Sequence, residues 1–96
     1  MEDIKQLEQS TDIFKKYGAK YAALFGSRAR GEAGPDSDFD ILVKLEKPIG
    51  LFSFSNFQLE LEDRLKRKVD LVSEGGLNSK IREFVMRDLK IFYGHR

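Results

Sequence analysis

Two aspartates one residue apart, Asp38 and Asp40, stand at the start of an apolar run that continues to Val43. Because successive side chains of a β-strand point to opposite faces, these carboxylates are predicted to project from the same side of a strand. Neighbouring carboxylates repel each other unless a cation lies between them, and such a pair of oxygen ligands suits Mg²⁺. A pair of Mg²⁺ ions can activate an attacking oxygen and stabilise a leaving one in phosphoryl-type transfer. The alternative is a solvated strand end whose two acids bind nothing.

A Gly-Ser pair, Gly26-Ser27, ends the preceding apolar run and is followed by Arg28 and Arg30. Glycine permits backbone angles and close approaches that a Cβ would forbid. Ser27 is predicted to be the N-cap of a helix whose first turn carries both arginines. The N–H groups of such a helix start can bind an anion, and the serine hydroxyl adds a donor. We therefore expect a phosphate-binding turn in which Arg28 or Arg30 steadies a triphosphate. The alternative is an ordinary strand-to-helix turn with solvated arginines.

A third carboxylate, Asp70, lies inside the short β-branched run 68–72, which is predicted to be a strand. Both of its neighbours are apolar, and an acid inside a short buried strand needs a polar partner or a metal. If this strand lies beside the one with Asp38 and Asp40, the three carboxylates converge. Asp70 could then act as a general base toward an incoming hydroxyl, or bind a second metal ion. The alternative is an edge-strand aspartate in water.

Together these residues resemble the nucleotidyltransferase superfamily related to DNA polymerase β. The pattern is Gly26-Ser27, ten residues, Asp38-x-Asp40 and then Asp70 on a later strand. The fuller string GSRARGEAGPDSDFDILV, with KVDLV after a helix, is similar to the minimal nucleotidyltransferases, the shortest branch of the superfamily. The likeness covers nearly the whole chain, and no motif position departs from the pattern.

This resemblance implies the α/β (α+β) fold of the polymerase β-like nucleotidyltransferases and ATP bound through Mg²⁺. The candidate metal ligands and catalytic residues that it implies are the same three acids, Asp38, Asp40 and Asp70. The candidate contacts to the nucleotide are Gly26, Ser27, Arg28, Arg30 and Ser37.

Many minimal nucleotidyltransferases are encoded beside a HEPN-domain protein, with which they form a toxin–antitoxin pair. The resemblance therefore implies an antitoxin that transfers AMP from ATP to a hydroxyl, a tyrosine in particular, of a HEPN ribonuclease and silences it. Two alternatives stay open. One is a non-catalytic binding module that neutralises its partner by complex formation. The other is a transferase for a small molecule such as an aminoglycoside, or for an RNA end, although the chain has little room for an acceptor-binding domain.

The flanking sequence supplies the elements that must hold these residues. Apolar periodicity predicts helices over 2–17, 51–66 and 79–88, and strands over 21–25, 39–45, 68–72 and 91–93. Residues 31–37 are predicted to form a loop. We expect one domain over residues 1–96, with a small mixed β-sheet of three to four strands flanked by about three helices. The start of 51–66 carries more apolar side chains than one face can hide, which makes the surplus a candidate partner surface.

Composition narrows the classes of function. A net charge of +1 among 34% charged residues gives little support for nucleic-acid binding, so no direct nucleic-acid contact is expected. The absence of cysteine excludes disulfides and thiolate metal sites. We find no signal peptide and no apolar run that could cross a bilayer, and we expect a cytoplasmic protein. Because 96 residues leave little chain to enclose an acceptor, a partner protein or a homo-oligomer is expected to position it.

Overall fold

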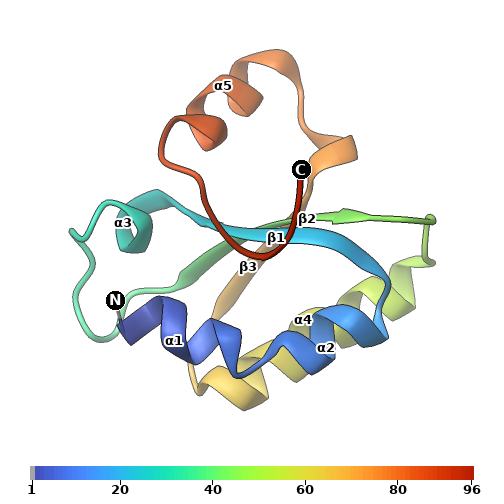
Figure 1. Ribbon diagram of the computed structural model, residues 1–96, viewed down its shortest axis with the longest axis horizontal. Coiled ribbons are helices and arrows are strands. Elements are labelled where there is room, and N and C mark those ends of the chain that lie inside the picture. Colours follow the sequence, from blue (N-terminus) through green and yellow to red (C-terminus); the bar gives the residue numbers. More distant parts are fainter. Residues whose placement is uncertain (1) are drawn as a thin grey trace.

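A mixed β-sheet organises the chain (Figure 1). The computed structural model describes residues 2–96, and within them the sheet has four strands in the order β3-β2-β1-β4. Strand β1 pairs antiparallel with both β2 and β4, whereas β2 and β3 are parallel. The bounds are β1 Ala19–Phe25, β2 Phe39–Leu45, β3 Val69–Ser73 and β4 Lys90–Gly94. The predicted α+β architecture with a small mixed sheet is confirmed.

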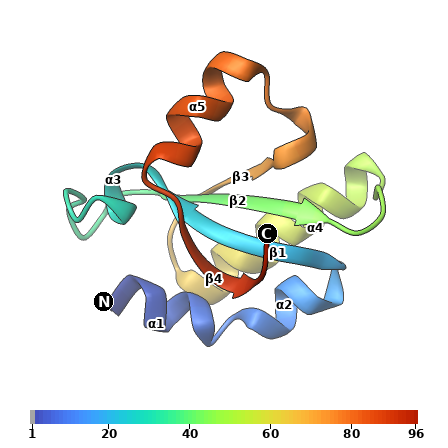
Figure 2. The ribbon, with the colours of Figure 1, turned by 45° about the horizontal axis from the view of Figure 1, so that its top comes forward.

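Helices lie on both sides of this sheet. Three of them, α1, α2 and α4, lie on one face, while α5 arches over the other (Figures 1 and 2). Helix α3 is a single turn that continues directly from β1, and a 3-10 turn, η1, follows β3. The bounds are α1 Glu2–Glu8, α2 Thr11–Lys16, α3 Gly26–Ala29, α4 Leu51–Leu65, η1 Glu74–Gly76 and α5 Ser79–Arg87. Within residues 2–96, every helix is too short or too polar to span a membrane.

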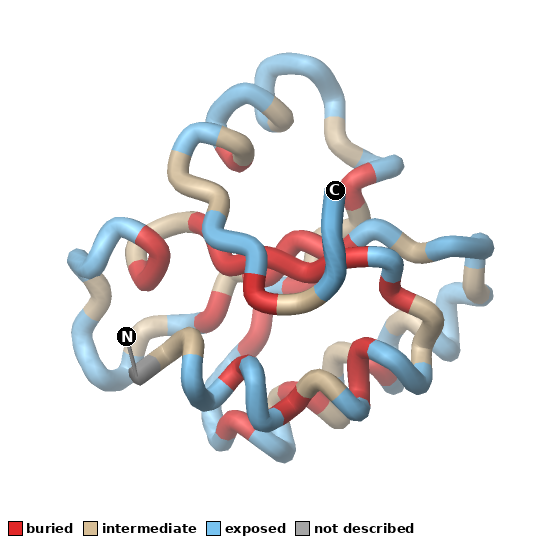
Figure 3. The backbone as a smooth tube through the Cα atoms, in the orientation of Figure 1, coloured by how far each residue is buried: buried red, intermediate tan, exposed pale blue. Residues whose placement is uncertain are grey.

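The two faces of the sheet carry separate apolar clusters. Buried residues lie along much of the strands and at intervals on the helices (Figure 3). Along β2, the side chains of Phe39, Ile41 and Val43 belong to the larger cluster, which packs under α1, α2 and α4. Leu42 belongs to the smaller cluster, together with Val85 of α5. Because strand side chains alternate, Asp40 must share the α5 face with Leu42. The sheet therefore separates the candidate acids from the main core.

The prediction of one helix over residues 2–17 is wrong, because the helix breaks between α1 and α2. At the break, Ser10 is fully buried, and its hydroxyl donates a hydrogen bond to the carbonyl of Gln6 at 3.3 Å. Its backbone N–H bonds to the carbonyl of Leu7, three residues back, which closes α1 as a tight turn. The other predicted elements lie within two residues of the observed bounds.

Helix α4 leaves part of its apolar surface in water, as its sequence indicates. It buries Phe57, Leu61 and Leu65 against the sheet. Near its start, Leu51 and Phe52 are 80% and 88% exposed. The use of this surface by a partner stays a prediction.

Candidate active site

Two acids meet where β2 and β3 begin. Asp40 and Asp70 are direct partners in the parallel register of the two strands. Both project to the α5 face, because Leu42 and Val72, two residues further along each strand, pack in the apolar cluster there. The predicted adjacency of the two acid-bearing strands is confirmed. Asp38 comes just before β2 and is exposed.

The electrostatics of these acids favour a cation. Burial raises the pKa of Asp40, and the nearby charges of Asp70 and Asp38 raise it further, while Arg30 opposes the rise. Within the described part of the chain, no three acid, histidine or cysteine side chains lie close enough together to hold a metal ion, so the predicted convergence of Asp38, Asp40 and Asp70 is not observed. Such an incomplete set of oxygen ligands fits Mg²⁺, which usually takes one or two carboxylates and completes its shell with water and phosphate oxygens.

Gly26 lies against the carboxylate of Asp40. Its φ is +74°, and a Cβ added there would stand 2.4 Å from Oδ2 of Asp40. The contact follows from the sheet register, since Phe25, the residue before it, pairs with Asp40. Only glycine allows both the backbone angle and this close approach. The Gly-Ser turn and the acids therefore form one site.

The predicted N-cap at Ser27 is wrong. Helix α3 begins at Gly26, its N-cap residue is Phe25, and no side-chain cap bond is made there. The backbone of Gly26 is in the left-handed region and turns the chain directly after β1, so the helix starts two residues earlier than the sequence indicates. Ser27 thus lies in the first turn of α3, next to the glycine that contacts Asp40.

Arg30 lies near the acids, and its charge acts on Asp40. Its guanidinium donates to Glu32 at 2.9 Å and to Asp88, at the C-terminal end of α5, at 3.4 Å. This position is compatible with the predicted contact to phosphate. The hydroxyl of Ser37 instead accepts a hydrogen bond from the N–H of Gly34 at 3.0 Å and closes the loop before β2.

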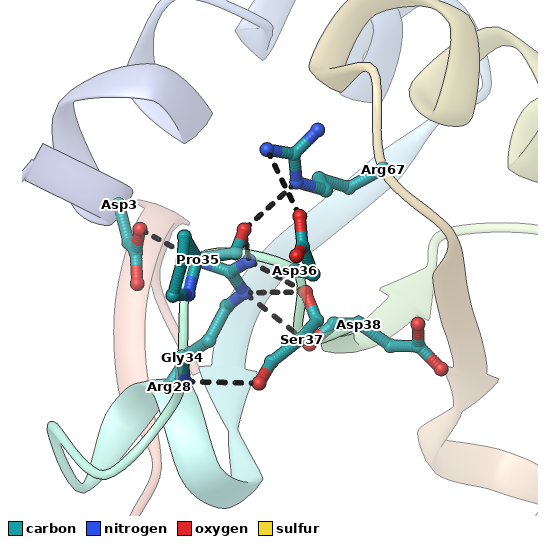
Figure 4. A network of polar contacts seen from close by, with 8 residues as sticks. All are labelled: Asp3, Arg28, Gly34, Pro35, Asp36, Ser37, Asp38 and Arg67. Carbon is teal, nitrogen blue, oxygen red and sulfur yellow. Dashed lines mark hydrogen bonds and ion pairs between the residues drawn. The ribbon is translucent and has the colours of Figure 1, made fainter.

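Arg28 lies on the other side of the loop that carries Asp38 (Figure 4). It is buried, with 7% of its surface exposed, and its guanidinium stacks over the ring of Phe39 at 4.1 Å. Because Phe39 faces the main core, this guanidinium lies on the side opposite to Asp40. The geometry does not support the predicted contact of Arg28 with a triphosphate. Its actual partners were not foreseen, because nothing in the local sequence links it to residues 35–38.

Comparison with known proteins identifies the family. The profile described as "Polymerase beta, Nucleotidyltransferase" matches residues 8–95. The chain belongs to this nucleotidyltransferase family. The protein adenylyltransferase MntA of Thermococcus cleftensis is 38% identical over 78 residues, which cover 81% of this chain and 79% of MntA. The family match makes this chain an enzyme of the nucleotidyltransferase class.

Solved structures share the fold of the nucleotidyltransferase. A toxin–antitoxin structure with AMP-PNP has a TM-score of 0.81 and 20% identity, with 95% of this chain and 74% of that chain covered. A structure of the tri-AMPylated HEPN toxin of Shewanella oneidensis with its MNT antitoxin has a TM-score of 0.76 and 18% identity. That match covers 99% of this chain and 74% of the other. At these identities the similarity establishes the fold.

Proposed function

We propose that this nucleotidyltransferase transfers AMP from ATP to a tyrosine hydroxyl of a HEPN-domain toxin and thereby acts as its antitoxin. The observation that carries the proposal is the placement of Asp40 beside both Asp70 and Gly26 on the α5 face of the sheet. The adenylyltransferase name of the archaeal relative supports the reaction. The structures with AMP-PNP and with an AMPylated HEPN toxin support the nucleotide and the partner.

In this proposal, Asp38, Asp40 and Asp70 bind Mg²⁺, and Gly26 and Ser27 lie along the triphosphate. Bound Mg²⁺ supplies charge neutralisation for the phosphates and the leaving group. The tyrosine oxygen attacks the α-phosphorus, and the bond from that phosphorus to the bridging oxygen breaks, which releases pyrophosphate. The proton of the tyrosine passes to Asp70, the acid at the start of β3.

The test is to mix this chain with the product of its neighbouring gene, ATP and Mg²⁺, and to record the intact mass of that partner. We expect the partner to gain one or more adenylyl units. The Asp38→Ala/Asp40→Ala double variant should fold, as judged by circular dichroism, and should lose transfer by at least about 10³-fold. Transfer at the wild-type rate by this variant would contradict the proposal.

Asp36→Ala is the matched control, because Asp36 lies in the same loop but its side chain is 96% exposed and pairs with Arg67 at 3.8 Å. Transfer by this variant should stay within about twofold of wild type. A stable complex without a gain of mass in any variant would instead indicate a non-catalytic binding module. Labelling of a small molecule or an RNA end in place of the partner would identify a different acceptor.

A further inference from the structure

Arg28 is a buried cation that the proposed chemistry does not use. Its Nε donates to the carbonyl oxygens of Ser37 at 3.0 Å and of Asp38 at 3.3 Å. One terminal nitrogen donates to the carbonyls of Pro35 and Ser37, and the other to the carboxylate of Asp3 at 3.0 Å. One side chain thus bonds three carbonyls along the loop that leads to the acids (Figure 4).

The ring of Phe39 explains how these bonds act on the carboxylates. The guanidinium of Arg28 lies over this ring, and the ring is buried in the main core. Phe39 lies between Asp38 and Asp40 in the chain. Because side chains alternate along extended backbone, a fixed Phe39 directs the side chains of both neighbours toward the opposite face of the sheet. In Figure 4 the carboxylate of Asp38 points away from the arginine network.

We propose that Arg28 is a positioning residue for the transfer reaction, which sets the orientation of Asp38 for metal binding by fixing the backbone of residues 35–38. The role rests on the proposed function of the acids. Arg28 also follows Ser27 directly on α3, so the same side chain ties the Gly-Ser turn to the loop of Asp38. The two halves of the motif are therefore held at a fixed spacing by a contact across the chain.

Lysine cannot replace this arginine. The guanidinium is a planar fork with several donors and stacks on an aromatic face, whereas the ammonium is a compact point charge. Arg28→Lys therefore keeps the charge but leaves loop carbonyls without a donor and loses the stacking on Phe39. Groups that orient metal ligands typically contribute 10–100-fold to metal affinity.

Arg67 provides a matched control. It donates to the same Pro35 carbonyl at 2.9 Å, but from outside the loop, and its side chain is 40% exposed. Its other contacts go to the carbonyl of Lys66 and to the carboxylate of Asp36. Arg67→Lys therefore changes an arginine on the loop without touching the carbonyls next to the acids.

The first measurement is a titration of the full chain with Mn²⁺ alone, followed by the broadening of the amide NMR signals of Asp40 and Asp70. We expect Arg28→Lys to raise the Mn²⁺ concentration at half-effect at least about tenfold and Arg67→Lys to leave it within about twofold. Asp40→Asn should abolish the selective broadening. Thermal unfolding establishes that each variant is folded.

The second measurement is the Mg²⁺ concentration that gives half-maximal AMP transfer. In Arg28→Lys it should rise by the same factor, while the rate at saturating Mg²⁺ returns to within about threefold of wild type. A purely structural role would lower the amount of active protein without moving this concentration. If folded Arg28→Lys reaches half-maximal transfer at the wild-type Mg²⁺ concentration while Asp40→Asn is inactive, the positioning role is overturned and the proposed function stays intact.

If Arg28→Lys does not fold, Asp3→Asn is the deciding variant, because it removes the charge of the partly exposed carboxylate that Arg28 contacts at 3.0 Å. We then expect a shift of about two- to threefold in the same direction, and an unchanged value would overturn the role. A wild-type chain that shows no selective effect of Mn²⁺ and no Mg²⁺-dependent transfer would overturn the proposed function, and the role of Arg28 with it.

Discussion

At the scale of single residues, the site depends on the absence of a side chain as much as on the acids. Gly26 has a positive φ, and its Cα faces the carboxylate of Asp40. Gly31 has nearly the same φ, +73°, but a Cβ added there would meet nothing within 4 Å. Substitution of the two glycines therefore separates the effect of a side chain at a positive φ, which both share, from the effect of a contact with Asp40, which only Gly26 makes.

We expect Gly26→Ala to reduce AMP transfer by more than about 100-fold, because the new Cβ displaces Asp40. Gly31→Ala should leave transfer nearly unchanged, although both variants lose roughly 1–2 kcal/mol of stability at the left-handed position. Adenylylation rates and urea unfolding of the two variants check this. Equal loss of transfer in both would mean that the backbone angle, and not the contact with Asp40, explains the effect.

The raised pKa of Asp40 has a consequence for stability. A carboxyl whose pKa is higher in the folded chain than its ordinary value of 3.8 favours folding in its protonated form. Its contribution is thus fully present below pH 3.8 and is lost as pH rises through the folded pKa. The ionised acid at neutral pH destabilises the chain in the absence of a cation.

Asp40→Asn, which mimics the protonated acid, should therefore have a higher free energy of unfolding than wild type at pH 7. The difference should disappear below pH 3.8, where the wild-type residue is itself protonated. Urea unfolding between pH 3 and pH 7 measures both. Mg²⁺ should raise the melting temperature of wild type and not of the variant, and the idea fails if Asp40→Asn is the less stable protein at neutral pH.

At the scale of elements, the strands were predictable because their signals are local. The apolar runs of β1, β2 and β3 and the periodicity of α4 are visible within a few residues, and the structure places them close to the predicted ranges. The break between α1 and α2 was not predictable, because no glycine or proline marks it. It depends on the burial of Ser10, which tertiary packing decides.

In the candidate site, too, features with a local sequence signal were predictable and features that depend on tertiary contacts were not. The spacing of Asp38 and Asp40 and the strand of Asp70 are sequence features, so the adjacency of the acid-bearing strands was predictable. The start of α3 and the contacts of Arg28 were not. Both depend on partners brought near by the sheet: the carboxylate of Asp40 for Gly26, and the carbonyls of residues 35–38 for the arginine.

At the scale of the whole molecule, Glu74 joins parts of the chain that are distant in sequence. It is 7% exposed, and the hydroxyl of Tyr21 in β1 donates to it. Three cations lie within 3.8 Å of its carboxylate: Lys44 of β2, Arg82 of α5 and Arg96. Burial, which by itself would raise the pKa of Glu74, is outweighed by the bond from Tyr21 and by these cations, so the pKa is lowered. Burial and this carboxylate also raise the pKa of Tyr21 to about 12.

We expect Glu74→Gln to lower the free energy of unfolding at pH 7 by about 1–3 kcal/mol, because the hydrogen bond from Tyr21 to a charged acceptor is weakened and the ion pairs are lost. A lowered carboxyl pKa stabilises the fold above the ordinary value of 4.5, and this stabilisation is lost as pH falls through the folded pKa. The difference from wild type should therefore shrink in acid. Chemical unfolding across this range is the measurement, with the exposed Glu83→Gln as control. If the difference in free energy of unfolding between Glu74→Gln and wild type grew toward low pH, the ion pairs of Glu74 would not be its cause.

The two apolar clusters differ in what holds them together. In the smaller one, four of the five buried side chains belong to β1 and β2, while α5 contributes Val85 and the partly buried Met86. Detachment of α5 would therefore expose this smaller cluster but would leave the larger cluster under α1, α2 and α4 intact. The native ensemble should contain such partially opened molecules far more often than unfolded ones, and they uncover the very face that carries the acids. Local detachment of α5 would then determine how often a large acceptor can reach the face that carries the acids.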